Sequence, residues 1–290
     1  MKAVVITGVS TGIGYSAAHY FVNQGISVFG SVRTKEDGDR LVKQLGSLFY
    51  PLLFDITDEE KVNEAALQVR KELQGNRLWG LINNAGIVIP GPFLYMSSTD
   101  FRKQLEVNLV GQLIVTKAFI PLLGEDTTLK GPPGKIINLS SVSGKRAFPF
   151  MGAYAVSKYG IEAFSEALRR ELMVFGIDVV IVGPGTIKTP IWSKAKNAQF
   201  SEEARHSVYG QAIAKLNEFI TAFEAQGLAP ENVAKLLWNI MQTKHPKVRY
   251  APMPNKFINW FIPNLLPIRF IDWLIAKKFN LLKNKGSETQ

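Results

Sequence analysis

Short apolar runs that alternate with helical patterns restrict this 290-residue chain to few folds. Runs such as KAVVIT, KIINL and DVVIV are almost continuously apolar, as parallel strands buried on both faces must be. Stretches with helical spacing separate these runs. The alternation predicts an α/β fold, in which a parallel sheet of about seven strands is covered by helices on both faces in a three-layer α/β/α arrangement.

The expected elements follow one another regularly along the chain. Strands are expected at residues 2–7, 27–33, 48–54, 78–83, 135–139 and 178–182, with a shorter one near 248–251. Helices are expected at residues 13–24, 58–74, 99–123, 152–175 and 230–242. Residues 1–254 are expected to form a single domain with a helical flap at about 190–226, and residues 255–290 a tail rich in aromatic and basic side chains.

A glycine-rich loop, TGVSTGIG, follows the first expected strand and leads into a helix. Its glycines allow a tight turn that a pyrophosphate can approach, and the helix offers free N–H groups and the positive end of its dipole. Because the loop lies between a strand and a helix, it predicts dinucleotide binding. The residues expected to contact the dinucleotide are Gly8, Ser10, Thr11, Gly12, Ile13 and Gly14.

The end of the second expected strand indicates which dinucleotide fits. A carboxylate there binds the 2′-hydroxyl of NAD, whereas an arginine accepts the 2′-phosphate of NADP. The strand ends without a carboxylate and with Arg33, whose planar guanidinium can hold a phosphate through two hydrogen bonds. The sequence therefore favours NADP(H). NAD(H) stays open, because Arg33 could be a solvated loop charge and Thr11 occupies the place of a second common basic residue.

Tyr154 and Lys158 lie four residues apart on one face of the expected helix 152–175. A nearby ammonium stabilises a phenolate and lowers the pKa of the phenol, which can then exchange a proton with an alcohol oxygen. Ser140 and Ser141 close the strand before this helix, at the carboxyl edge where parallel sheets bind ligands. Such a pair alone is often structural, but together with the glycine loop it favours catalysis.

Six motifs occur in order: TGVSTGIG, NNAG, NLVG, NLSS, YAVSK and PG. Together they resemble the short-chain dehydrogenase/reductase family, in its non-extended branch, over residues 1–190. The resemblance implies a Rossmann-like fold and hydride transfer between a nicotinamide and an alcohol or carbonyl carbon. It implies that Tyr154 is the general acid/base, that Lys158 lowers its pKa and bonds the nicotinamide ribose, that Ser141 holds the substrate oxygen, and that Asn108 anchors a water in a proton relay. It also implies cofactor contacts by Asp55, Ile56, Asn84, Ala85, Gly86, Pro184, Gly185, Ile187 and Thr189.

Three stretches, VFGSVRTKEDGDRL, WGLINNAGI and GIEAFSEALRREL, are similar to the retinol, hydroxysteroid and 3-hydroxybutyrate dehydrogenase branch. This implies an apolar, retinoid-, steroid- or lipid-like alcohol or carbonyl substrate. Four aromatic residues of the expected flap could line its pocket or pack the flap's own core: Trp192, Phe200, Tyr209 and Phe223. The resemblance also implies a homodimer or homotetramer, formed through the helices that carry Asn108 and Tyr154.

The net charge of +10 suits a nucleic acid, a membrane surface or an anionic ligand. Because the basic residues are spread out, we expect no nucleic-acid partner. The aromatic and basic segment 257–285 suits either packing on the protein or peripheral membrane contact. With no signal peptide and no long uncharged apolar run in view, we expect a cytoplasmic protein that could associate with membranes through this tail. The absence of cysteine excludes disulfides and thiolate metal sites, and we expect no metal.

Two other functions remain open at this point. A non-catalytic dinucleotide-binding regulator would keep the glycine loop, although it would not need Ser141, Tyr154 and Lys158 together. A serine hydrolase is the second alternative, because residues 8–12 match the GxSxG nucleophile elbow with Ser10 at its centre. That reaction needs a histidine partner, and none of the three histidines, His19, His206 and His245, lies in a matching motif.

Overall fold

The computed structural model describes residues 2–196, 200–255 and 265–282. A seven-stranded sheet lies at its centre, with the order β3-β2-β1-β4-β5-β6-β7, and every neighbouring pair of strands is parallel. This confirms the expected doubly wound, Rossmann-like sheet. The strands are β1 (Ala3–Ile6), β2 (Ser27–Val32), β3 (Phe49–Leu53), β4 (Gly80–Asn83), β5 (Lys135–Leu139), β6 (Asp178–Val182) and β7 (Arg249–Tyr250). The strand order reverses between β1 and β4, where such sheets bind their ligands.

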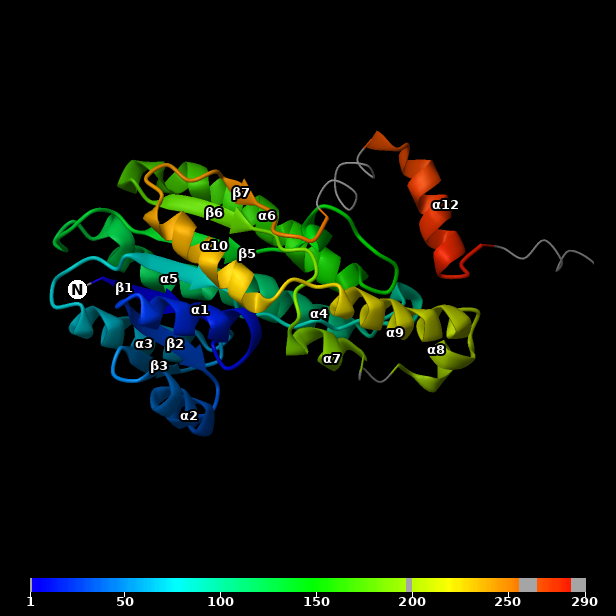
Figure 1. The fold of residues 1–290 in the computed structure, drawn as a ribbon, viewed down its shortest axis with the longest axis horizontal. Helices are drawn as coiled ribbons and strands as arrows, with labels where there is room; N and C mark the ends of the chain where they lie inside the picture. Colours follow the sequence, from blue (N-terminus) through cyan, green and yellow to red (C-terminus); the bar gives the residue numbers. More distant parts are fainter. Residues whose placement is uncertain (1, 197–199, 256–264, 283–290) are drawn as a thin grey trace, which may run out of the picture.

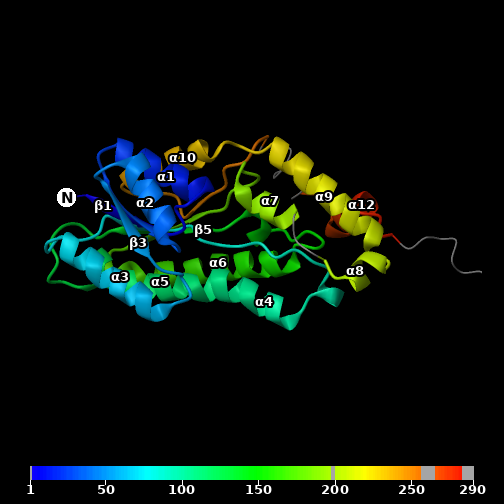
Figure 2. The same cartoon turned by 90° about the horizontal axis from the view of Figure 1, so that it is seen from below.

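Helices cover both faces of the sheet (Figures 1 and 2). One face carries α1 (Gly12–Asn23), α2 (Lys35–Leu45) and α10 (Pro230–Gln242), and the other carries α3 (Glu59–Glu72), α4 (Ser98–Leu105), α5 (Gly111–Ile120) and α6 (Gly152–Glu171). A hydrophobic core lies on each face of the sheet, because side chains along a strand such as β1 point alternately to the two faces. Val4 and Ile6 are buried with α1 and α10, whereas Ala3 and Val5 are buried with α3 and α5.

The structure corrects two expectations about helices. No helix was expected at residues 35–45, yet α2 forms there, because the Thr34 side chain caps it by accepting a hydrogen bond from the Asp37 N–H at 3.3 Å. The single helix expected at 99–123 is interrupted, since π-turns follow α4 and α5. These are η2 (Glu106–Val110) and η3 (Pro121–Glu125), and π-turns of this kind are frequent at functional sites.

The stretch Ser98–Glu125 is long and apolar enough to cross a membrane by length and composition. Half of its most apolar window is nevertheless buried inside the protein, as in the core helix of an α/β layer. The stretch packs against α3, α6 and β4. The shorter helical turns are η1 (Phe93–Tyr95), η4 (Val142–Gly144) and η5 (Leu172–Phe175).

Residues after β6 form helices beyond one end of the sheet (Figure 1). The expected flap region contains α7 (Pro190–Lys196), α8 (Glu202–His206) and α9 (Gly210–Ala225). The C-terminal end of α12 (Ile268–Lys278) reaches α9, where the Lys278 ammonium lies 4.5 Å from the centre of the Phe219 ring. Phe279, directly after α12, is 1% exposed, and its ring lies 5.4 Å from that of Phe219 on α9 and 6.3 Å from that of Phe150. Part of the tail therefore packs on the protein, whereas residues 256–264 and 283–290 lie outside the described chain.

Candidate active site

The glycine-rich loop joins β1 to α1 at the carboxyl edge of the sheet. Gly8 and Gly12 have φ angles of +70° and +61°, in the left-handed region that favours glycine. A Cβ atom on Gly14 would lie 2.2 Å from the Gly8 carbonyl oxygen, so only glycine allows α1 to begin so close to the loop. Thr11 makes no side-chain capping hydrogen bond to α1, whereas α2, α3 and α4 are capped by Thr34, Asp58 and Ser97. The N-terminus of α1 is thus left open to an anionic group.

Hydrogen bonds fasten this loop to β4. The buried Thr7 hydroxyl accepts the N–H groups of Asn84 at 2.9 Å and Ala85 at 3.0 Å. The Asn84 side chain in turn donates to the carbonyl oxygens of Thr7 at 2.8 Å and Gly8 at 3.1 Å. Asn84, which the family resemblance assigns to the cofactor, therefore also holds the two strands together where the strand order reverses.

A continuous cleft runs along the carboxyl ends of the strands and contains about 2610 Å³ of empty space, part of it open to solvent. Two predicted residues lie outside its lining: Gly14, which packs against Gly8, and Asn108, which is 1% exposed. The glycine cradle, and a lining that continues from the loop after β1 to the residues after β6, fit a dinucleotide. The predicted residues that line it are Gly8, Ser10, Thr11, Gly12, Ile13, Arg33, Asp55, Ile56, Asn84, Ala85, Gly86, Ser141, Tyr154, Lys158, Pro184, Gly185, Ile187 and Thr189.

Two arginines lie near the glycine loop. Arg33 follows β2, is exposed and lines the cleft. Arg40 on α2 donates to the Ser10 carbonyl oxygen at 3.0 Å and pairs with Asp37 at 2.7 Å. Arg40 was not anticipated, because α2 itself was not, although a threonine followed by an acidic residue three positions later is a helix-start signal.

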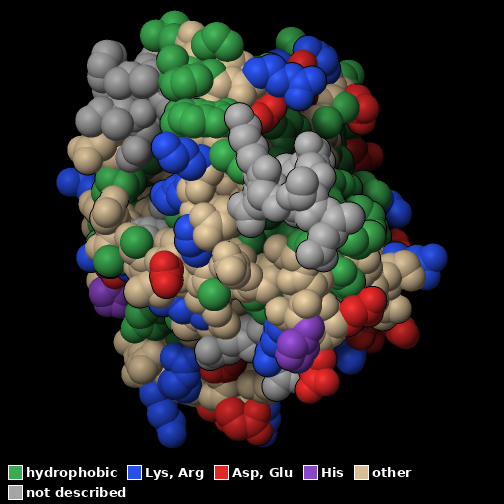
Figure 3. All heavy atoms as spheres, turned by 90° about the vertical axis from the view of Figure 1, so that its right-hand side faces the viewer, with side chains coloured by type: hydrophobic (Ala, Val, Ile, Leu, Met, Phe, Trp, Pro, Cys, Tyr) green, Lys and Arg blue, Asp and Glu red, His purple; other side chains and the backbone are tan. Residues whose placement is uncertain are grey.

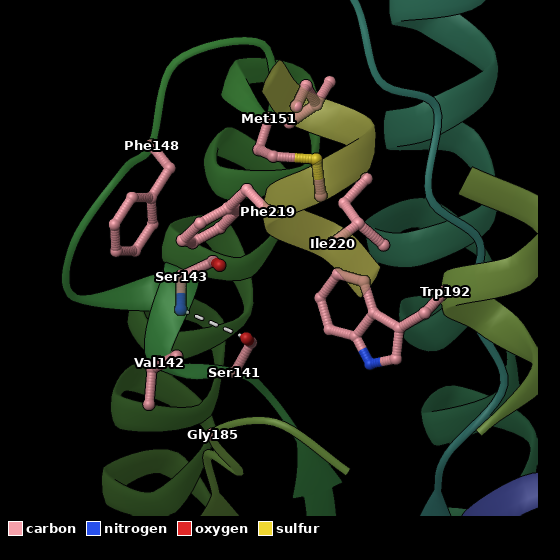
Figure 4. A pocket seen from close by; sticks show the side chains of 10 residues that line it. Ser141, Val142, Ser143, Phe148, Met151, Gly185, Trp192, Phe219 and Ile220 are labelled. Carbon is pink, nitrogen blue, oxygen red and sulfur yellow. Dashed lines mark hydrogen bonds between the residues drawn. The ribbon is translucent and has the colours of Figure 1, made fainter. Parts of the chain in front are cut away.

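Tyr154 and Lys158 on α6 meet Ser141 at the end of β5. All three are buried, and the Tyr154 hydroxyl is hydrogen-bonded to the Ser141 side chain. The Ser141 hydroxyl also accepts the Ser143 N–H at 3.1 Å (Figure 4). The Lys158 ammonium donates to the Leu139 carbonyl oxygen at 2.7 Å and lies 5.7 Å from the centre of the Tyr154 ring. The spacing of the motifs therefore predicted the meeting of these three side chains correctly.

The protonation behaviour of this group differs from the expectation. Burial raises the pKa of Tyr154 to about 12, and its hydrogen bond with Ser141 offsets this only in part. Burial also lowers the pKa of Lys158 to about 8, against the opposing effect of the Glu162 carboxylate. The expectation that the lysine brings the tyrosine pKa toward neutral pH is wrong for this structure, because desolvation of the phenolate dominates. Tyr154 is therefore protonated at neutral pH.

Asn108 lies in the π-turn η2 and connects two parts of the site. Its side-chain oxygen accepts the Ile87 N–H at 2.8 Å, and its amide donates to the Ile87 carbonyl oxygen and to the Ser157 hydroxyl, both at 3.0 Å. Ser157 precedes Lys158 on α6, so Asn108 fastens the segment after β4 to the helix that carries Tyr154. Its role in anchoring a relay water stays a prediction.

An apolar pocket adjoins Ser141 (Figure 4). Trp192 of α7 lines it, and Trp192, Phe200 and Tyr209 all pack against the core cluster that includes Leu216, Ile220 and Phe279. Trp192 thus takes both expected roles and Phe200 and Tyr209 pack the flap's core, whereas the side chain of Phe223 lies outside what the structure describes. The full lining is Ser141, Val142, Ser143, Phe148, Met151, Gly185, Trp192, Leu216, Phe219 and Ile220.

Comparison with known proteins identifies the family. The family model described as short chain dehydrogenase matches residues 2–199. The chain belongs to this family. It is 37% identical over 286 residues to the NADPH-dependent 3-dehydrocapnine reductase of Ornithobacterium rhinotracheale, covering 99% of this chain and 100% of that protein. It is 32% identical over 295 residues to human retinol dehydrogenase 5, covering 94% of this chain and 89% of that protein.

The fold agrees with this assignment. A short-chain dehydrogenase structure from Streptomyces avermitilis superposes with a TM-score of 0.75 at 25% identity, covering 98% of both chains. Family, fold and relatives together make the protein an NAD(P)-dependent oxidoreductase with a Rossmann nucleotide-binding fold that acts on a small molecule.

The structure of this short-chain dehydrogenase does not support a hydrolytic triad at Ser10. The His19 ring hydrogen-bonds Asn23 and stacks on Tyr15 at 6.2 Å. His206 bonds the Glu202 carbonyl oxygen within α8, and His245 is exposed. Within residues 2–196, 200–255 and 265–282, no histidine is hydrogen-bonded to Ser10 and no cluster of three or more histidine or carboxylate ligands could hold a metal.

Proposed function

We propose that this short-chain dehydrogenase reduces an apolar ketone or aldehyde to the alcohol, with Tyr154 as the general acid. The observation that carries the proposal is the buried hydrogen bond between Tyr154 and Ser141, which lies in the cofactor cleft and adjoins the apolar pocket. A phenol with a pKa of about 12 is protonated at neutral pH and can donate to a carbonyl oxygen. In the reverse reaction Tyr154 would be the general base.

The reduction needs one hydride and one proton, and few protein groups take part in supplying them. When bound, the reduced nicotinamide supplies a hydride to the carbonyl carbon. Tyr154 gives its proton to the carbonyl oxygen, and Ser141 holds that oxygen by a hydrogen bond as negative charge develops on it. The Lys158 ammonium, held by the Leu139 carbonyl oxygen, would return a proton to the tyrosine. Asn108, bonded to Ser157 on the same helix, would anchor the water that resupplies that proton.

NADP(H) is the proposed cofactor. The glycine loop, Asp55, Ile56, Asn84 and the residues that follow β6 would hold the dinucleotide in the cleft. Arg33 would bind the 2′-phosphate, while Arg40, which pairs with Asp37, holds the Ser10 carbonyl oxygen of the same loop. The NADPH dependence named for the Ornithobacterium relative supports this choice, with NAD(H) as the alternative.

The proposed substrate is lipid-, retinoid- or steroid-like. Aromatic and aliphatic side chains of α7, α9 and the segment before α6 line the pocket beside Ser141. The relatives' names, a 3-dehydrocapnine reductase and a retinol dehydrogenase, are consistent with a carbonyl or alcohol substrate. In this proposal residues 1–254 form the catalytic domain, residues 190–226 its flap, and residues 255–290 the tail.

A carbonyl panel tests the proposal. Apolar ketones and aldehydes are mixed with NADPH or NADH, and loss of the reduced-nicotinamide absorbance is followed. Tyr154→Phe should reduce turnover at least about a thousandfold while NADPH still binds, because the phenol is the proton donor. Tyr20→Phe is the matched control, since Tyr20 packs on Trp238 and lines neither the cleft nor the apolar pocket. Normal turnover in Tyr154→Phe would refute the mechanism, and NADPH binding without any turnover would favour the regulator.

We also propose that the protein forms a homodimer or homotetramer through α5 and α6. Apolar side chains are exposed on this face: Val110 at 38%, Leu113 at 43%, Val156 at 44% and Tyr159 at 44%. Light scattering after size-exclusion chromatography measures the assembly. Leu113→Glu should reduce the mass toward that of one chain, and an unchanged mass would exclude this face.

Contact of α12 with an anionic membrane surface is a further proposal, for a protein expected in the cytoplasm. Phe270, Trp273 and Leu274 are 47%, 44% and 41% exposed, and the Lys277 ammonium lies 5.1 Å from the Trp273 ring centre. On the face shown in Figure 3, hydrophobic side chains gather in the upper part with basic side chains beside them. Such a pattern suits an interfacial helix.

Vesicle co-sedimentation tests this contact with the full chain. Binding should require phosphatidylglycerol in phosphatidylcholine vesicles, because lysines supply part of the attraction. The double variant Phe270→Ala with Trp273→Ala should lose binding. Equal recovery of this variant and the wild type with the vesicles would exclude α12 as the contact.

A further inference from the structure

A buried cluster of charges lies one helical turn beyond Lys158. Glu162, four residues further along α6, is 6% exposed. Its two carboxylate oxygens accept hydrogen bonds from the Arg249 Nε at 3.2 and 3.0 Å, and one of them lies 3.3 Å from the Lys145 ammonium. A carboxylate buried to this extent needs such partners, because its desolvation is otherwise strongly unfavourable.

The cluster is packed directly against the loop that carries Ser141. A Cβ atom on Gly144 would lie 2.8 Å from the Lys158 carbonyl oxygen and 3.1 Å from the Glu162 Cγ. The loop that contains η4 therefore meets α6 at the turn between these two charged residues. The absence of a side chain at Gly144 is what permits this contact.

Arg249 reaches the same loop from the other side. A Cβ atom on Gly183 would lie 2.4 Å from one terminal nitrogen of Arg249 and 3.3 Å from the Ser141 carbonyl oxygen. The guanidinium and the Ser141 backbone therefore both lie next to Gly183, and the same guanidinium pairs with Glu162. The Arg249–Glu162 pair joins β7 to α6, and the Lys145–Glu162 pair joins the Ser141 loop to the same carboxylate.

The balance of charge around Lys158 depends on Glu162. From α6 itself, Lys158 and Glu162 face the cluster, and the next carboxylate on that helix, Glu166, is 54% exposed and pairs with Arg170. The segment after η4 contributes Lys145, followed by the half-buried Arg146, and β7 contributes Arg249. Lys145 and Arg249 thus pair with one buried carboxylate, and that carboxylate lies one helical turn after Lys158 on the same helix.

We propose that Glu162 is a positioning residue that keeps the buried Lys158 in its ammonium form, with Arg249 and Lys145 as the counter-cations that hold Glu162 in place. The inference rests on the proposed function, because it concerns the lysine of that site. Glu162 acts through Lys158 and contributes no atom to the lining of the cofactor cleft or the apolar pocket.

A direct titration tests this without substrate or cofactor. The full-length protein is labelled with ¹³C at the lysine ε carbons, and the Lys158 signal is assigned by its loss in Lys158→Arg. Glu162→Gln should lower the pKa of Lys158 by about one unit or more, because an adjacent opposite charge is removed. Glu162→Asp keeps the charge and should leave that pKa within a few tenths of the wild-type value.

Arg249→Gln should shift the pKa of Lys158 in the opposite direction. Without this cation the negative charge of Glu162 is less neutralised and stabilises the Lys158 ammonium more strongly, so the pKa of Lys158 should rise. A merely structural cluster would shift the lysine in the same direction in both charge-removing variants, or in neither. Either result would overturn the inference, even if each variant lost stability.

The pH profile of ketone reduction separates this inference from the proposed function. The alkaline limb of kcat should move to lower pH in Glu162→Gln by the same amount as the lysine titration. If the wild type reduces no carbonyl compound while the titration shifts as expected, the proposed function fails and the assignment of Glu162 stands. If the wild type is active and neither the titration nor the limb moves, the inference alone fails.

Discussion

Burial of the Lys158 ammonium leads to a stability prediction that needs no substrate. The pKa of this lysine falls from an ordinary 10.5 to about 8 in the folded protein, because burial disfavours the charge. Between these values the unfolded chain binds more protons than the folded one, so stability rises with pH from about 8 to about 10.5. Below about pH 8 both states are protonated and the full cost of the buried charge is present, about 3 kcal/mol at 1.36 kcal/mol per pKa unit.

The substitution Lys158→Met removes this titration. Between about pH 7 and about pH 9.5, the wild type should gain about 2 kcal/mol in free energy of unfolding relative to the variant. Urea denaturation at both pH values measures the difference, and titrations common to both proteins cancel in it. Lys61→Met is the matched control, because Lys61 is 59% exposed and its loss should leave the gain intact. If Lys158→Met gains as much stability as the wild type, Lys158 is not titrating as a buried amine.

Three further outcomes follow from particular contacts. Gly14→Ala should weaken NADPH binding about tenfold or more, because its Cβ would lie 2.2 Å from the Gly8 carbonyl oxygen, and fluorescence titration measures this effect; unchanged affinity would show that the loop can move away from α1 without loss of binding. Arg33→Asp should raise the Kd for NADPH at least about tenfold and that for NADH little, and equal losses in both titrations would contradict the phosphate assignment. Phe279→Ala should raise the KM for apolar ketones without changing NADPH affinity, because Phe279 supports Phe219 in the pocket wall, and an unchanged KM would show that the contact is not needed.

The sheet was predictable because its strands carry their own signal. KAVVIT and DVVIV are apolar at nearly every position, which marks a strand buried on both faces. Helix α2 was missed because KEDGDRLVKQL is mostly polar, contains Gly38 and buries only Gly38, Leu41 and Leu45. Its stability comes from the Thr34 cap and from docking on the sheet, which composition alone does not reveal.

The site was predictable where its chemistry is local in sequence. Tyr154 and Lys158 share a helix face, and Ser141 lies two residues after β5, so the spacing of the motifs indicated that they would lie close together. The supporting contacts are not local. The Arg249–Glu162 bond joins residues 87 positions apart, and the Asn84–Thr7 bonds join residues 77 apart. Such partners are defined only by the tertiary fold.

The sign of the tyrosine pKa shift was wrong for a related physical reason. Helix spacing shows that an ammonium lies near a phenol, but it does not show how much water either group loses on folding. At this site the same burial disfavours both the phenolate of Tyr154 and the ammonium of Lys158. A protonated phenol can donate its proton to the carbonyl oxygen in the reduction. A lysine that readily loses its proton is less able to return one to the tyrosine. A buried lysine therefore needs a nearby anion to stay protonated more than an exposed lysine does. Glu162, buried one turn further along α6, is such an anion.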